Sequence, residues 1–127
     1  MGNLLSILSH CERGKAAIIG YKNHINLYEG GGISMLGGVF AKTIPTQKDG
    51  TLSLEDIEGA ISDPEDPHQA QTSLVCLENT QNSMGGIALP ISYIKQVKEL
   101  VKRYKLSLHL DGARVLNAAV YLGVKPS

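Results

Sequence analysis

The stretch that decides the fold runs from Leu108 to Arg114 and reads LHLDGAR. Its leucines, beginning with Leu106, alternate with polar residues, and this alternation predicts a buried β-strand. The strand runs into the carboxylate of Asp111, and open α/β sheets bind ligands beyond the carboxyl ends of their strands. Arg114 lies at the start of a helix predicted over 113–122. One short segment therefore offers an anion and a cation to a single cleft.

The remainder of the chain alternates between predicted helices and predicted strands. The helices are expected over 3–11, in part of 24–36, and over 53–61 and 90–104, and the strands over 16–20, 39–44, 73–77 and 106–110. This alternation predicts an α/β layered fold with a mostly parallel sheet. Three consecutive glycines at 30–32 disfavour a helix by roughly 1 kcal/mol each, so we expect a close backbone approach there.

Composition narrows the class of protein. The chain has 127 residues, with 12 basic and 12 acidic side chains and a formal net charge of 0. This size predicts one domain, and the balanced charge predicts neither a nucleic-acid partner nor a membrane partner. Cys11 and Cys76 are isolated and lack metal-ligand spacing, and Cys76 is expected to be a buried thiol. Such cysteines fit a reducing compartment, so we expect a cytoplasmic protein.

Polar side chains follow three of the predicted strands. His24 comes after the strand over 16–20, Gln81 lies in the polar loop that begins at Glu78, and Asp111 ends the last strand. Each residue alone has an ordinary explanation, such as turn chemistry or, for Asp111, a helix cap. Because carboxyl ends of parallel strands share one edge of a sheet, together they predict a functional site.

A metal hydrolase is a second interpretation of the same residues. Its ligands would be Glu78, His109 and Asp111, because His-x-Asp is a usable ligand pair. His109 and Asp111 form this pair, but neither Glu78 nor any other residue has the spacing expected of a third ligand, so the sequence favours a site without metal.

Several segments taken together resemble a known family. They are Met1 to Asn3, His24-Ile25 with Tyr28-Glu29, Asp49 to Leu52, Leu77 to Asn82 with Gly85-Gly86, Leu89-Pro90, and His109 to Arg114 with Asn117-Ala118. In this order they are similar to the signature segments of threonine aldolases, which are fold-type-I enzymes that use pyridoxal phosphate. The resemblance implies the large domain of that fold and a carbon–carbon lyase of amino-acid metabolism. Such a lyase cleaves threonine or allo-threonine to glycine and acetaldehyde, in threonine catabolism and glycine biosynthesis.

The resemblance also implies a role for each matching residue. Asp111 would pair with the pyridine nitrogen of the cofactor, and His24 would stack on its ring near the substrate hydroxyl. Gly2 and Asn3 would lie beside the cofactor phosphate, where helix amides favour anions. Arg114 would bind the carboxylate of the amino-acid substrate.

The sequence departs from the family pattern at Gln81, where the family has a histidine that acts near the substrate hydroxyl. A glutamine cannot exchange a proton near neutral pH, so we expect Gln81 to lie at the substrate end of the cleft without acting as a base. The small phosphate-binding residues of the family precede its Met-Gly-Asn segment, and its Schiff-base lysine lies downstream of the Asp-Gly-Ala-Arg segment. No lysine of this chain has a matching context.

We therefore expect residues 1–127 to be one partial domain, the middle of the cofactor-binding domain. The lysine segment and the C-terminal small domain would be missing, the chain alone would be inactive, and the full-length form would be a homo-oligomer. The alternative is a non-catalytic truncated paralogue that acts only by association with a full-length subunit.

Overall fold

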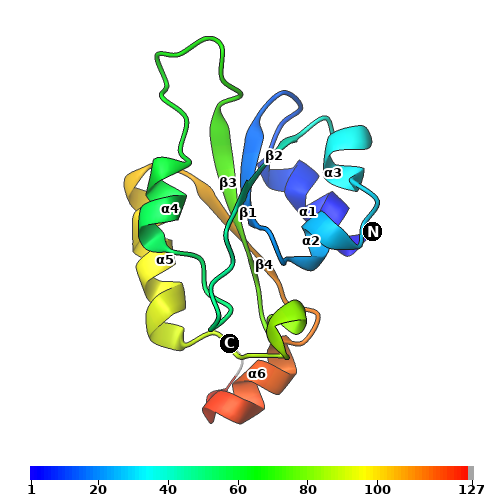
Figure 1. Ribbon diagram of the computed structural model, residues 1–127, viewed down its shortest axis with the longest axis vertical. Helices are drawn as coiled ribbons and strands as arrows, with labels where there is room; N and C mark the ends of the chain where they lie inside the picture. The colour runs from blue at the N-terminus through cyan, green and yellow to red at the C-terminus, as the bar shows by residue number, and fades with distance from the viewer. Residues whose placement is uncertain (126–127) are drawn as a thin grey trace.

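Four strands form one sheet in the computed structural model, which describes residues 1–125 (Figure 1). They are β1 (Ala16–Gly20), β2 (Phe40–Ile44), β3 (Thr72–Glu78) and β4 (Ser107–Asp111). Their order across the sheet is β2-β1-β3-β4, and every neighbouring pair is parallel. The α/β fold with a mostly parallel sheet, as predicted from the sequence, is confirmed.

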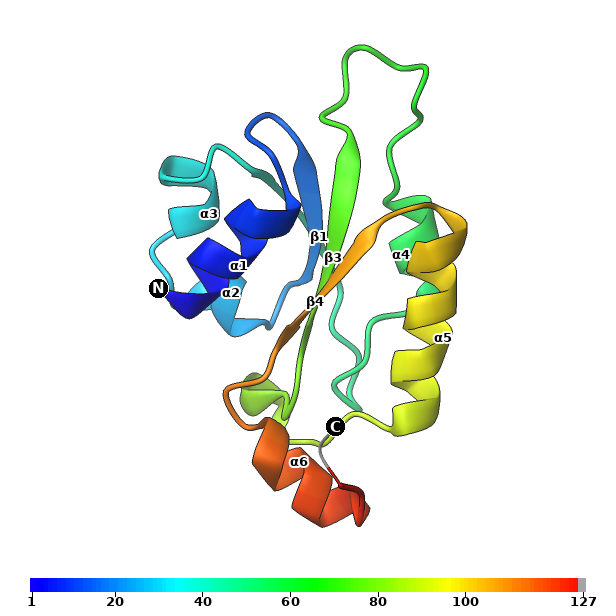
Figure 2. The same cartoon turned by 180° about the vertical axis from the view of Figure 1, so that it is seen from behind.

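Helices cover both faces of the sheet, as the two opposite views show (Figures 1 and 2). The helices are α1 (Gly2–His10), α2 (His24–Leu27) and α3 (Gly32–Met35) on one face, α4 (Leu54–Gly59) and α5 (Ile91–Arg103) on the other, and α6 (Val115–Leu122) beyond the carboxyl end of β4. A single 3-10 turn, η1, spans Asn82–Met84. Within residues 1–125, no helix is long and apolar enough to cross a bilayer.

An apolar layer on each face of the sheet holds these helices. On the α1–α3 side, Ile7 and Ile33 pack with Leu74 of β3. On the α4–α5 side, Ile57 and Val97 belong to a cluster with residues of β1 and β3. All of β1 is buried, as expected for a strand covered on both faces.

Local signals in the sequence explain where several helices begin. Ser53 Oγ accepts a hydrogen bond from the Asp56 amide and so caps the N-terminus of α4. Pro90 immediately precedes α5, where its missing N–H leaves no donor unpaired. Arg114 occupies the N-cap position of α6 rather than its first turn.

The prediction of a close backbone approach at the three glycines is wrong. A Cβ added at Gly30, Gly31 or Gly32 would meet no atom within 4 Å. Gly30 and Gly31 instead have φ angles of 59° and 66°, in the left-handed region that favours glycine. These two glycines turn the chain between α2 and α3.

The strand order determines where a ligand can bind. From β1 the chain crosses to β2 on one side and then to β3 on the other, so the connections diverge at the carboxyl ends of β1 and β3. Open α/β sheets bind their ligands at such a switch point. The loops after β1, β3 and β4 all lie at this edge.

Candidate active site

Asn3, in the first turn of α1, links segments that are far apart in the sequence. Its Nδ2 atom donates to Glu29 Oε1 and to Asp111 Oδ2, each at 2.7 Å. Its Oδ1 atom lies 3.0 Å from His109 Nε2, which must donate because an amide oxygen only accepts. The amide of Asn3 therefore fixes two carboxylates and one imidazole at the carboxyl edge of the sheet.

Asp111 ends β4 with only 8% of its surface exposed. Its Oδ1 atom accepts the Ala113 amide at 3.1 Å, and its Oδ2 atom accepts the Asn3 amide. Both of these donors are neutral. Because α6 starts at Val115 with Arg114 as its N-cap residue, Asp111 is not the cap of that helix. Its charge is therefore available to a cationic group in the adjoining cavity.

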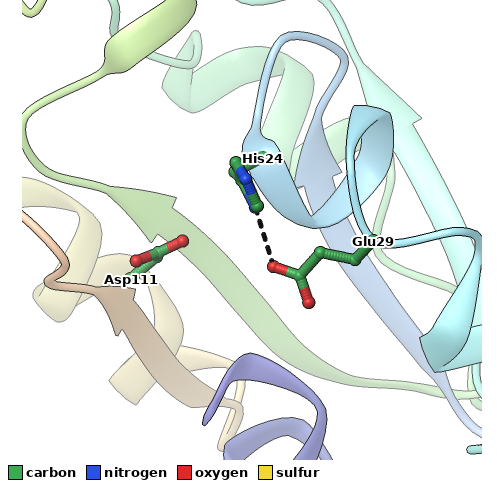
Figure 3. A group of neighbouring side chains, drawn as sticks. All are labelled: His24, Glu29 and Asp111. Atoms are coloured by element: carbon green, nitrogen blue, oxygen red, sulfur yellow. Dashed lines mark hydrogen bonds and ion pairs between the residues drawn. The ribbon is translucent and has the colours of Figure 1, made fainter. Parts of the chain in front are cut away.

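His24 and Glu29 form a hydrogen-bonded pair facing Asp111 (Figure 3). His24 Nδ1 lies 3.0 Å from Glu29 Oε1, and the two side chains are 44% and 16% exposed. An ionised carboxylate only accepts hydrogen bonds, so Nδ1 carries the proton. In the neutral imidazole, Nε2 is then left with a lone pair that can accept a proton.

A cavity of about 470 Å³ lies over this group and is of the size that binds small molecules. Its lining includes five predicted site residues: Gly2, Asn3, His24, Asp111 and Arg114. A second hollow of about 810 Å³ lies between η1 and α6 and shares Arg114 with the first. The guanidinium of Arg114 is therefore placed to serve a ligand that extends across both.

A metal ion is the other group that this cluster could hold. Among the described residues, His24, Glu29 and Asp111 bring ligand atoms within 4.8 Å of one another. This set differs from the hydrolase ligands considered from the sequence. Asn3 Nδ2 already donates to both carboxylates, so a metal would share these groups with the Asn3 amide.

Gln81 lies in a different place from the one predicted. The residue is 1% exposed and is absent from the linings of both cavities. Its Nε2 atom donates to the Lys22 carbonyl at 3.0 Å, and its Oε1 atom accepts the Met84 amide at 2.9 Å. The Gln81 amide is thus paired with two backbone groups of neighbouring segments and faces neither cavity. The predicted position in the cleft is wrong, and a part in catalysis stays a prediction.

Burial shifts the pKa of three groups near the sheet. It lowers the pKa of His109, although the charge of Asp111 opposes this shift. It raises the pKa of Cys11 and of Cys76, and Cys76 is fully buried as predicted. Because the thiolate is the reactive form, neither cysteine is suited to act as a nucleophile.

The chain matches the family model of the beta-eliminating lyases over residues 1–127. It belongs to the beta-eliminating lyase family. This member of the family is 52% identical over 126 residues to probable low-specificity L-threonine aldolase 2 of Arabidopsis thaliana, covering 98% of this chain and 36% of the relative. It is 44% identical to the low specificity L-threonine aldolase of Escherichia coli K12, covering 95% of this chain and 35% of the relative.

The structure of this family member is also similar to that of a threonine aldolase. It matches threonine aldolase from Leishmania major with a TM-score of 0.83 and 29% identity, over 93% of this chain and 33% of that one. The resemblance to threonine aldolases that the sequence motifs indicated is confirmed. The chain spans about a third of the length of the curated relatives it matches.

The sequence motifs of this family member did not predict that Glu29 pairs with His24. Glu29 lies five residues after His24, a spacing that brings no side chains together on a regular helix. Helix α2 ends at Leu27, so Glu29 lies outside the helix and its side chain reaches back to His24. The glycine run after a histidine was the available signal, but it indicates a turn and not its direction.

Proposed function

We propose that this protein uses pyridoxal phosphate to cleave threonine or allo-threonine into glycine and acetaldehyde. The similarity to threonine aldolases supports this reaction class. The observation that carries the proposal is the buried Asp111 carboxylate, which is bonded only to neutral donors and faces a cavity shared with His24 and Arg114.

The residues present fit this cofactor. A carboxylate at Asp111 can hold a protonated pyridine nitrogen, and the half-exposed ring of His24 can stack on a flat aromatic group. Gly2 and Asn3 open α1, whose amides favour a phosphate group. When bound, the cofactor would supply an electron sink for breaking the carbon–carbon bond. We propose that these four residues hold it.

Side chains around the cofactor would bind the substrate and accept its proton. Arg114 would bind the substrate carboxylate through paired N–H donors and so orient the bond to be broken. His24 Nε2 would accept the proton of the substrate hydroxyl. Glu29 would hold the proton on Nδ1 and stabilise the imidazolium that forms. A positioned base of this kind contributes ~10²–10⁴-fold to the rate.

An absorbance titration tests the cofactor part of this proposal. Pyridoxal phosphate is added to the full-length wild-type protein and to its Asp111→Asn and Asp56→Asn variants. Asp56 is exposed in the first turn of α4. We expect a shifted cofactor band in the wild type and in Asp56→Asn, with a different spectrum for Asp111→Asn because the ring nitrogen loses its anion. Identical spectra for all three proteins would contradict the assignment of Asp111.

We also propose that residues 1–127 belong to a larger cofactor-binding domain that assembles into a homo-oligomer. The share of each relative that the chain matches supports the first part. On α6, Leu116, Val120 and Tyr121 are 64%, 84% and 81% exposed, which supports the second. Light scattering on the purified protein measures its mass in solution, and a monomer would contradict the oligomer.

A further inference from the structure

Glu78 ends β3 with a buried carboxylate beside the strand that carries Asp111. It is 4% exposed, and the pairing of β3 with β4 places it opposite Asp111. A carboxylate is rarely buried unless it is paired or hydrogen-bonded. None of the ion pairs within residues 1–125 includes Glu78, so N–H donors must stabilise its charge.

Two backbone amides are these donors. Glu78 Oε2 accepts the His24 amide at 2.7 Å, and Oε1 accepts the Asn82 amide at 3.0 Å. Hydrogen bonds to a charged acceptor are about twice as strong as neutral ones. His24 is the first residue of α2, and its N-cap residue Asn23 makes no side-chain capping bond. Glu78 therefore replaces the missing cap from a neighbouring strand.

Further hydrogen bonds hold the same short segment. Gln81 Nε2 donates to the carbonyl oxygen of Lys22 at 3.0 Å. Asn23 Nδ2 donates to the carbonyl oxygen of Cys76 at 3.4 Å. Together with the carboxylate described above, these bonds tie each residue from 22 to 24 to β3 or to the loop after it. The backbone that carries the imidazole is thus held by the edge of the sheet in addition to the hydrogen bonds of α2.

We propose that Glu78 is a positioning residue for His24, holding the start of α2 so that Nδ1 meets Glu29 and the ring faces the cavity. This inference rests on the proposed function, in which His24 Nε2 accepts a proton. A carboxylate is required because its two oxygens accept both backbone amides at once. A glutamine has one acceptor oxygen, and its NH₂ group would face an N–H donor.

Nitrogen-15 NMR of the histidine rings tests this role without cofactor or turnover. Spectra are recorded at about pH 8.5, where an imidazole of ordinary pKa is neutral. In the wild type we expect His24 to show a single tautomer protonated on Nδ1, assigned by its absence in His24→Asn. In Glu78→Gln we expect this pattern to be lost, as in Glu29→Ala. Glu58→Gln, at an exposed site on α4, should keep it.

A folded Glu78→Gln protein with the wild-type His24 pattern would overturn the proposal, because Glu78 would then only support the fold. If circular dichroism shows that Glu78→Gln does not fold, amide hydrogen exchange of the wild type decides instead. The proposal expects strong protection of the His24 amide, and exchange as fast as that of an exposed amide would refute it. Failure of the wild type to bind pyridoxal phosphate would contradict the proposed function but leave the ring signals of His24 as a test of Glu78.

Discussion

The two faces of the sheet are covered by apolar side chains, whereas its carboxyl edge carries buried polar side chains. Both faces are covered by apolar layers, such as the one that packs Leu74 against α1 and α3. The edge instead gathers most of the buried polar residues, including Glu78, Gln81 and Asp111. Burial of apolar surface stabilises a fold, whereas buried polar networks fix geometry and bring little net stability. Changes to the faces should therefore affect stability, and changes to the edge should affect the proposed reaction.

The largest effect on stability is expected from Leu74→Ala. Leu74 lies in β3 with 0% exposure, so the truncation leaves a cavity in the apolar layer. The free energy of unfolding should fall by about 2–5 kcal/mol, measured by urea denaturation. Leu36→Ala is the matched control, because Leu36 is 60% exposed and its loss should change stability by less than about 0.5 kcal/mol. Equal losses of unfolding free energy in both variants would contradict the role given to the buried apolar layer.

Asp111→Asn, at the edge of the sheet, should affect turnover much more than stability. The amide keeps the shape of the side chain but has no charge for a cationic ring nitrogen, so in the full-length protein we expect turnover of the proposed reaction to fall by on the order of 10²-fold, about 3 kcal/mol. The free energy of unfolding should change much less, because the donors from Asn3 and Ala113 are neutral. Measurement of acetaldehyde release beside thermal unfolding checks both parts. A destabilised variant with near-normal turnover would show that Asp111 serves only the fold.

Tyr93→Phe tests a polar group inside an apolar layer. The Tyr93 hydroxyl accepts the Leu52 amide and donates to the Leu52 carbonyl, each at 2.9 Å. Removing it leaves two buried backbone groups without partners, so the free energy of unfolding should fall by about 1–3 kcal/mol. Tyr121→Phe, at an 81% exposed site, should be nearly neutral in the same denaturation experiment. A neutral Tyr93→Phe would mean that these backbone groups find other partners.

The smallest expected effect is a pH dependence that arises from His109. Burial lowers the pKa of His109 in the folded state, so the unfolded state binds more protons as the pH falls below the ordinary value of 6.5. Folding stability should therefore decrease from about pH 6.5 downward and be fully retained above it. His109→Gln, which can still donate to Asn3, should lose less stability on acidification. His68→Gln, at a 90% exposed side chain, should follow the wild type. Parallel wild-type and His109→Gln curves would contradict this assignment.

Local patterns determined most of the fold. The alternation of leucines from Leu106, and the helical and strand patterns along the rest of the chain, predicted the strands and helices to within a few residues of their observed bounds. Such patterns work because burial and backbone dihedral angles repeat with the period of each element. The motifs around His24 and Asp111 likewise indicated the correct edge of the sheet and the family.

Only the tertiary structure decided which side chains meet at that edge. Asn3 and Asp111 are separated by 108 positions in the sequence and become neighbours through the packing of α1 beside β4. Glu29 reaches His24 from beyond the end of α2, and Gln81 pairs with the Lys22 carbonyl and the Met84 amide. These contacts depend on strand register and loop path, which carry no periodic signal in the sequence. The sequence by itself therefore determined the elements, the family and the edge that carries the candidate site, while the fold decided the partners of each polar group.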